Sequence, residues 1–174
     1  MNAVATTAVE LSVIVPAFNE AARIASGVQA ILTYLRARGR SWELIVVDDG
    51  SADETADRVQ QIIATEPCAR LIQYRPNRGK GFAVRTGVLA ANGMWIVFLD
   101  ADLSTPVSEI DRALPRLQKG VDLVVGSRAH PDACIERTSS LFRRMASLVF
   151  DRVRNAIVGL HQFSDTQCGF KAAS

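Results

Sequence analysis

Two aspartates, Asp100 and Asp102, follow directly after the apolar run of residues 94–99. The run predicts a buried strand, and open α/β sheets bind their ligands at the carboxyl ends of strands. Side chains at i and i+2 point the same way while a strand stays extended, so both carboxylates can reach one cation. Mg²⁺ and Mn²⁺ prefer oxygen ligands and keep positions for the oxygens of a diphosphate. The pair therefore favours a divalent-cation site, with solvated or helix-capping acids as the ordinary alternative.

Three further polar segments also follow predicted strands, namely residues 16–20, 48–51 and 126–128. Parallel strands end at one edge of their sheet, so these segments and the two aspartates should converge on one cleft. The first two segments each have an ordinary explanation as well. The first suits the end of a strand and a helix cap at Asn19, and the second suits a turn. Their joint arrangement favours a binding site.

Phosphate binding in this chain must depend on a metal and on cationic side chains. Neither the glycine-rich dinucleotide fingerprint nor the P-loop motif occurs in the sequence. Residues 77–81, Asn-Arg-Gly-Lys-Gly, offer a flexible backbone and two cations that suit a phosphate, although an exposed basic turn would have the same composition. Asp49 could accept hydrogen bonds from a nucleobase imide or a ribose hydroxyl.

Strands and helices alternate along the chain, which predicts βαβ units and an α/β fold with a mostly parallel sheet flanked by helices. The helix that follows the first strand is expected to end at Gly39, Asp53 to cap the next one, and Pro106 to lie in the first turn of the fourth. A loop over residues 161–171 nearly closes the chain. The predicted strands cover residues 11–16, 43–47, 70–74, 94–99 and 121–125, and the predicted helices residues 21–38, 53–65, 82–91, 106–119 and 137–160.

Length and composition fit one compact domain over residues 1–174, with a loose tail over residues 1–10. The chain has 174 residues, of which 48% are hydrophobic and 22% charged. The net charge of +2 is too small to argue for a nucleic-acid partner. Three cysteines, far apart and odd in number, form neither a metal motif nor a disulfide framework, which favours a reducing cytoplasm. The composition is compatible with a monomer or a dimer.

No signal peptide or spanning segment is expected. The first ten residues lack a basic start followed by an apolar run, and no stretch approaches the roughly 18 apolar residues of a spanning helix. We therefore expect a cytoplasmic protein, or one that lies peripherally on the cytoplasmic face of a membrane.

At these residues the chain resembles a known family. Residues 13–20, 46–51 and 77–81 look like those of the inverting nucleotide-sugar glycosyltransferases of family 2. Residues 100–106, 126–128 and 165–171 are similar to those of dolichyl- or polyprenyl-phosphate glycosyltransferases, closest to the glucosyl-transferring branch, with the dolichol-phosphate mannosyltransferases also related. The resemblance runs from about Leu11 to Lys171 in order and spacing.

The resemblance implies a GT-A (Rossmann-like) fold, a divalent cation (Mg²⁺ or Mn²⁺), a nucleotide-diphosphate sugar and a polyprenyl or dolichyl phosphate acceptor. The variant at residues 103–106 favours UDP-glucose as the donor, with GDP-mannose second. The residues implied for base and ribose are Pro16, Ala17, Glu20 and Asp49, and Lys80 is implied for the donor. Those implied for metal or donor are Asp100 and Asp102, with Ser104 as a further ligand. Arg128 is implied to face phosphate, and Arg137 or one of Arg143 and Arg144 to help hold the acceptor phosphate.

The charges on the metal, the arginines and the reacting phosphates suggest a mechanism. The metal and the arginines can stabilise the negative charge that grows on the departing nucleoside diphosphate. A phosphate monoester has a second pKa of about 6, so it is already a competent nucleophile near neutrality. Asp165 would serve as a general base if the acceptor were a sugar hydroxyl; otherwise it caps a helix or pairs with Lys171 or an arginine. In-line attack would invert the anomeric centre.

Residues 137–160 combine an apolar side with several arginines. Such a helix can lie on an anionic membrane surface near a lipid carrier, or it can be an ordinary core helix with a solvated basic face. The chain ends at Ser174, whereas relatives of this kind continue with further helices, so we expect a fragment or a short form. The alternatives to lipid glycosylation are transfer to a saccharide hydroxyl and a truncated nucleotide-binding module without turnover.

Overall fold

The computed structural model describes residues 8–39, 41–127 and 168–174 of the chain. By its internal contacts the chain divides into one unit of residues 1–124 and 169–174 and another of residues 125–168. The site described below belongs to the first unit. The predicted helix over residues 137–160 lies outside the described residues, and the single domain over residues 1–174 stays a prediction.

The centre of the fold is a six-stranded sheet with the order β3-β2-β1-β4-β6-β5. The first four strands along the chain pair in parallel, which confirms the predicted α/β class with a mostly parallel sheet. β1 is buried along its whole length and β2 over all but its first residue, as expected for strands covered on both faces. The strands are β1 (Leu11–Ala17), β2 (Trp42–Asp48), β3 (Ala69–Gln73), β4 (Trp95–Leu99), β5 (Leu123–Val125) and β6 (Phe170–Ala173).

The predicted loop over residues 161–171 was wrong at its end, because Phe170 begins β6. This strand runs antiparallel to β4, with Leu99 opposite Phe170 and Phe98 opposite Lys171. Its four residues alternate between buried and half-buried, which is too short a pattern to separate from a loop in the sequence. β6 lies between β4 and β5, so it gives β4 a hydrogen-bonded neighbour on its second side.

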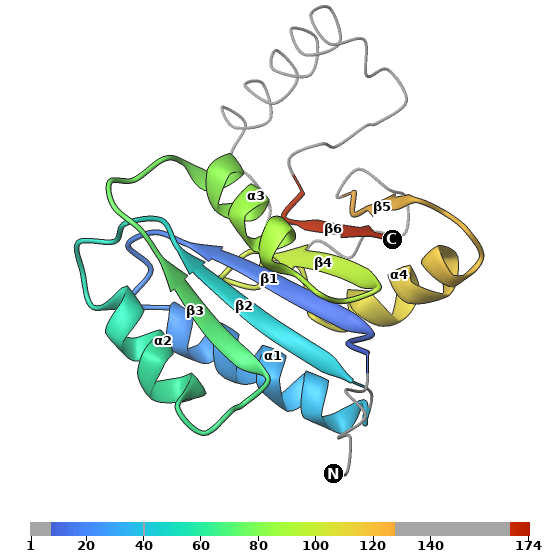
Figure 1. The fold of residues 1–174 in the computed structure, drawn as a ribbon, viewed down its shortest axis with the longest axis horizontal. Helices are drawn as coiled ribbons and strands as arrows, with labels where there is room; N and C mark the ends of the chain where they lie inside the picture. Colours follow the sequence, from blue (N-terminus) through green and yellow to red (C-terminus); the bar gives the residue numbers. More distant parts are fainter. Residues whose placement is uncertain (1–7, 40, 128–167) are drawn as a thin grey trace, which may run out of the picture. The chain divides into compact units, whose positions relative to one another are not determined.

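Helices cover both faces of the sheet (Figure 1). α1 and α2 contact each other on one face, and α3 packs over β1 and β2 on the other. α3 comes close to the sheet at Gly87, where a Cβ atom would overlap Ile14 Cγ2. α4 contacts β4 and β6. The helices are α1 (Ile24–Ala37), α2 (Thr55–Ile63), α3 (Lys80–Ala90) and α4 (Glu109–Gln118). None of the helices over the described residues is long and apolar enough to cross a membrane.

The expected helix cap at Asn19 was wrong. Asn19 has φ 51°, in the left-handed region, and α1 begins only at Ile24. The side chain of Asn19 instead accepts a hydrogen bond from the backbone N–H of Ala52, with an Oδ1 to N distance of 2.9 Å. Asparagine tolerates both roles, so its type alone does not separate a cap from a bridge between loops. Asn19 therefore joins the segment after β1 to the segment after β2.

The other helix boundaries were predicted with mixed success. Gly39, with φ 62°, follows the last turn of α1 as expected. Glu54, and not Asp53, is the N-cap residue of α2, although Asp53 Oδ1 accepts a hydrogen bond from the Thr55 N–H at 3.0 Å. Pro106 does not lie in the first turn of α4. It belongs to a preceding turn, in which its carbonyl accepts a hydrogen bond from the Glu109 N–H at 3.1 Å.

Candidate functional site

The strand order reverses between β1 and β4, and a cavity of about 380 Å³ lies at the carboxyl ends of these strands. Open α/β sheets bind their ligands at such a switch point. The cavity contains all six residues predicted for the nucleotide sugar, together with Asp102. Its lining is Pro16, Ala17, Phe18, Glu20, Asp49, Asn77, Gly79, Lys80, Ala83, Asp100, Ala101 and Asp102.

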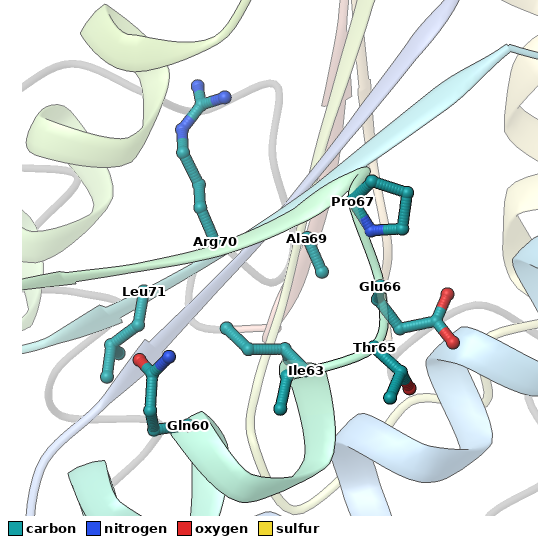
Figure 2. Close-up of a pocket in the computed structure, with 9 residues that line it drawn as sticks. Gln60, Ile63, Thr65, Glu66, Pro67, Ala69, Arg70 and Leu71 are labelled. Atoms are coloured by element: carbon teal, nitrogen blue, oxygen red, sulfur yellow. The ribbon is translucent and has the colours of Figure 1, made fainter.

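A larger hollow, of about 590 Å³, lies between the end of α2 and the edge strand β3 (Figure 2). It contains none of the residues predicted to do chemistry. Its arginine, Arg70, is already paired with Glu43, at an Nη1 to Oε2 distance of 2.7 Å, and donates a hydrogen bond to the Ala90 carbonyl. This hollow is the larger of the two, but the residues predicted to do chemistry line the smaller cavity, which is therefore the candidate site.

A turn, and not an extended strand, presents the two aspartates. β4 ends at Leu99, and the Leu103 N–H donates to the Asp100 carbonyl at 3.0 Å. Leu103 has φ 48°, a costly conformation for a leucine, and such outliers gather at functional sites. The expected extended i, i+2 geometry was therefore wrong. Asp100 and Asp102 nevertheless both line the cavity.

Two glycines let other elements approach this turn closely. A Cβ at Gly27 of α1 would overlap the Ala101 carbonyl oxygen. A Cβ at Gly169, just before β6, would overlap the carboxylate of Asp100, and the Asp100 N–H donates to the Gly169 carbonyl at 3.2 Å. Contacts with α1 and with the β6 segment thus fix the position of the acidic turn.

Both aspartates of the turn have polar or cationic partners. Lys80 Nζ lies 2.5 Å from Asp100 Oδ1. Partial burial disfavours the charge of Asp102, but hydrogen bonds from Ser104 and the nearby charges of Arg23 and Lys80 outweigh it and lower the pKa of Asp102. The bond from the Ser104 backbone N–H to Asp102 Oδ1 measures 3.0 Å. Ser104 thus contacts the acidic turn directly.

Two carboxylates at one cavity match the way proteins bind Mg²⁺, with one or two acids and with ligand phosphates completing the coordination. Over the described residues no group of three or more His, Cys, Asp and Glu side chains comes together to hold a metal. The donor set therefore fits a cation shared with a diphosphate better than a cage made by the protein alone.

Glu20 brings a further acid to the cavity. Its Oε2 atom is buried and receives no hydrogen bond, although Arg23 Nε lies 3.1 Å away in an ion pair. The Glu20 N–H donates to Thr55 Oγ1 at 2.8 Å, which fixes the backbone. A ligand hydroxyl that donated to Glu20 would supply the missing bond.

Sequence reasoning missed Phe18 as a candidate contact. Phe18 lines the cavity and is 45% exposed, which is unusual for a large apolar side chain beside a buried strand. Aromatic rings of this kind provide stacking surfaces for nucleobases. Its place between Ala17 and Asn19 after a predicted strand was the available signal.

The carboxylate of Asp49 has more hydrogen-bond partners within the protein than expected. It is 2% exposed, and its carboxylate accepts hydrogen bonds from the side chain of Asn77 and the backbone of Arg78. Tyr74 lies beside it, and burial, followed by interaction with Asp49, raises the pKa of the Tyr74 phenol above its usual range.

Some residues of the predicted site belong to the second unit or lie outside the described residues. Gly126 and Ser127 belong to the second unit, so their relation to the cavity is not described. The remaining predicted residues lie outside the described ranges, and their roles stay predictions: Arg128, Arg137, Arg143, Arg144 and Asp165.

Fold and cavity define an α/β protein with a candidate ligand cavity at the switch point of a mostly parallel sheet. The model of the family "Glycosyl transferase family 2" matches residues 12–171. The chain belongs to this family.

Its relatives include lipid-phosphate sugar transferases. A dolichyl-phosphate beta-glucosyltransferase of Trichomonas vaginalis is 37% identical over 91% of this chain and 50% of its own length. The enzyme of that name from Saccharomyces cerevisiae is 34% identical over 92% of the chain and 53% of its own length. An undecaprenyl-phosphate 4-deoxy-4-formamido-L-arabinose transferase of Pectobacterium carotovorum is 32% identical over 93% of this chain and 48% of its own length. The chain thus spans about half the length of the curated relatives it matches.

Solved structures agree on the fold. Glucosyl-3-phosphoglycerate synthase of Mycobacterium tuberculosis matches 95% of this chain and 56% of its own, with a TM-score of 0.67 and 29% identity. A mannosyltransferase of Pyrobaculum calidifontis in complex with GDP-mannose and Mn²⁺ matches 70% of this chain and 36% of its own, with a TM-score of 0.59 and 30% identity. The predicted GT-A fold is thereby confirmed.

Proposed function

We propose that this chain carries the donor site of an inverting glycosyltransferase that moves a hexose from a nucleotide-diphosphate sugar to a polyprenyl or dolichyl phosphate. The observation that carries the proposal is the cavity at the switch point, where Asp100, Asp102, Glu20 and Lys80 meet. The carboxylates of Asp100, Asp102 and Glu20 could bind a divalent cation and ligand hydroxyls. The ammonium group of Lys80 could bind phosphate.

UDP-glucose is the favoured donor. The relatives named beta-glucosyltransferases support glucose, and the mycobacterial synthase has been solved with Mn²⁺ and UDP-glucose. GDP-mannose is the second candidate, because the Pyrobaculum enzyme binds it with Mn²⁺. Phe18 would stack on the base, a contact that tolerates either nucleobase.

The chain's own residues would divide the work by charge. Asp100 and Asp102, with Ser104 beside them, would hold the divalent cation. When bound, Mg²⁺ or Mn²⁺ stabilises the negative charge that develops on the diphosphate. Lys80 would face the diphosphate from α3, and Glu20 would accept a hydrogen bond from the ribose or the sugar. Arg128 would add positive charge on the phosphate.

The acceptor phosphate needs no proton removed before it attacks, since its second pKa of about 6 leaves it mostly dianionic at neutral pH. Arg137, Arg143 and Arg144 would hold it. Attack on the face opposite the leaving diphosphate would invert the anomeric carbon. The predicted helix over residues 137–160 would approach a membrane from the cytoplasmic side, where the lipid carrier would be anchored.

Donor binding is tested by calorimetry on the purified chain. UDP-glucose and GDP-mannose are titrated with and without Mn²⁺, and Asp102→Ala serves as the variant without the cation ligand. We expect binding that requires Mn²⁺ and is lost in the variant. If both nucleotide sugars are ignored with and without Mn²⁺, the proposed donor site is wrong.

Transfer is tested with radiolabelled donor, polyprenyl phosphate in vesicles, and Mg²⁺ or Mn²⁺. Labelled lipid supports the proposed reaction, whereas metal-dependent nucleotide binding without any product supports a binding module. Asp165→Asn separates the two acceptor classes. A saccharide hydroxyl acceptor should lose most turnover in this variant, because it needs a base, and a phosphate acceptor much less.

A further inference from the structure

Asp49 has both carboxylate oxygens engaged by the segment that connects β3 to α3. Its Oδ2 accepts a hydrogen bond from Asn77 Nδ2 at 2.9 Å, and its Oδ1 accepts one from the Arg78 backbone N–H at 2.8 Å. Asn77 Nδ2 also donates to the Asp49 carbonyl at 3.0 Å. With 2% of its surface exposed, Asp49 offers little to a ligand in the cavity.

The neighbouring residues join the same two segments. Gly50 has φ 76°, and a Cβ there would lie 2.9 Å from the Asn77 nitrogen and 3.2 Å from the Tyr74 carbonyl oxygen. Only glycine fits this close backbone contact without strain. Arg75 Nη2 donates to the Ser51 carbonyl at 3.2 Å. The turn after β2 and the segment after β3 are therefore held together over several residues.

The same segment is anchored on its other side by aromatic contacts. The guanidinium carbon of Arg78 lies 3.5 Å from the centre of the Phe82 ring, a cation–π contact. Phe82 in turn packs edge-to-face on Tyr74 with 5.2 Å between ring centres. Asp49 and Phe82 thus fix Arg78 between them.

The segment leads directly into the cationic wall of the cavity. Asn77, Gly79 and Lys80 all line the cavity, and α3 begins at Lys80. Lys80 reaches across to Asp100, at the 2.5 Å already described. Whatever fixes residues 77–79 therefore fixes where the Lys80 side chain and the first amides of α3 face the ligand.

From these contacts we infer that Asp49 is a positioning residue, which acts through Asn77 and Arg78 to place Lys80 on the diphosphate side of the cavity. This inference rests on the proposed donor site and gives Asp49 a role that does not depend on the nucleobase. Reading of the base by Asp49 is the competing role.

The two roles differ in what Asp49→Asn would do. In this variant the new Oδ1 can still accept from the Arg78 N–H, but its amide Nδ2 then faces the Nδ2 of Asn77, donor against donor. If Asp49 positions the segment, affinity for UDP, GDP and pyrophosphate, each with Mn²⁺, should fall by a similar factor of about ten. If Asp49 reads the base, the losses for UDP and GDP differ and pyrophosphate binding is unchanged.

A double variant gives the sharper test. Asn77→Asp alone places two carboxylates together and should weaken binding as well. In Asp49→Asn combined with Asn77→Asp, the new amide at position 49 donates to the new carboxylate at position 77, and Oδ1 still accepts from Arg78. Asn77→Asp and the double variant both lose the bond to the carbonyl of residue 49, since a carboxylate cannot donate. We therefore expect the double variant to bind pyrophosphate more tightly than Asn77→Asp. A double variant no better than Asn77→Asp would overturn the inference.

Trypsin provides a readout that is independent of any ligand, since it cleaves after Arg78 when the segment is released. Cleavage there should be faster in both single variants, and slower in the double variant than in Asn77→Asp. Asp57→Asn, the same change on the exposed side of α2, is the matched control and should behave as the parent chain. Circular dichroism and the unfolding midpoint of each variant show that it is folded.

The two proposals fail differently. If the parent chain binds neither nucleotides nor pyrophosphate, the proposed donor site fails, and the protease pattern still tests the pairing of Asp49 with Asn77. If ligands bind but cleavage after Arg78 is unchanged in Asp49→Asn, the positioning role is wrong and the donor site stands.

Discussion

The Lys80 ammonium lies 2.5 Å from Asp100 Oδ1, so a lysine occupies an oxygen ligand that the proposed divalent cation would need. Two positive charges cannot share one carboxylate oxygen at that distance without strong repulsion. A cation that binds Asp100 through Oδ1 must therefore displace Lys80, and a diphosphate is the group that would accept the released ammonium. Metal binding and donor binding should consequently depend on each other.

Replacing Lys80 by methionine should strengthen Mn²⁺ binding in the absence of nucleotide, because the competing charge is gone. We expect a gain of about two- to fivefold, since the Lys80 side chain is more than half exposed and the ion pair is weak. Donor affinity should fall at the same time. Electron paramagnetic resonance of free Mn²⁺ measures the first effect and calorimetry with UDP the second. Lys119→Met is the matched surface control; unchanged or weaker Mn²⁺ binding in Lys80→Met would contradict the competition.

Asp102→Ala should abolish Mn²⁺-dependent binding of UDP-glucose while the chain stays folded. Asp102 is exposed on a turn, so its removal opens no cavity and should change the free energy of unfolding by less than about 1 kcal/mol. Calorimetry and a urea titration give the two quantities. An unfolded variant would show instead that the hydrogen bond from Ser104 to Asp102 is needed to fold the turn.

Much of the cavity lining could be predicted because parallel strands end at one edge of their sheet. That rule alone brings Pro16, Asp49 and Asp100 together. The partners of these residues could not be predicted. Asp49 binds Asn77 from 28 positions away, and no periodic pattern or cap signal encodes such a contact. The sequence also left β6 as a loop, because four alternating residues carry too little periodicity.

Gly169 lies directly against the Asp100 carboxylate, a contact that could not be predicted from the sequence. In Gly169→Ala the new Cβ would overlap the Asp100 carboxylate, so that side chain must move. We expect Mn²⁺-dependent donor binding to weaken by about tenfold or more, and stability to fall by about 1–3 kcal/mol, the usual cost of overpacking.

Gly81→Ala is the control for Gly169→Ala, because a Cβ at Gly81 meets nothing within 4 Å. An alanine inside α3 should raise stability by up to about 1 kcal/mol and leave the position of Asp100 unchanged. Calorimetry and thermal unfolding compare the two variants. Equal donor affinities in both would show that the contact between Gly169 and Asp100 has no role in binding.

Glu43 provides a test of stability that is independent of ligand binding. Its carboxylate is buried at the amino end of the sheet and accepts hydrogen bonds from Ser12 Oγ and the Asn92 N–H, both at 2.6 Å. Burial disfavours its charge, but these bonds and the charge of Arg70 outweigh it and lower the pKa of Glu43. The folded chain therefore holds Glu43 ionised at a pH where the unfolded chain has begun to take up the proton.

A lowered pKa means that the ionised Glu43 contributes its full stability above the unfolded value of about 4.5, and that this contribution is lost as the pH falls below it. Glu43→Gln should therefore cost about 2 kcal/mol at pH 7, where charged hydrogen bonds are lost, and progressively less below pH 4.5. Urea titrations of both proteins between pH 7 and pH 3 give the difference in unfolding free energy. Other acids titrate equally in the two proteins and cancel in that difference. A difference that stays constant over this range would mean that Glu43 acts through packing, and that its charge contributes nothing to the fold.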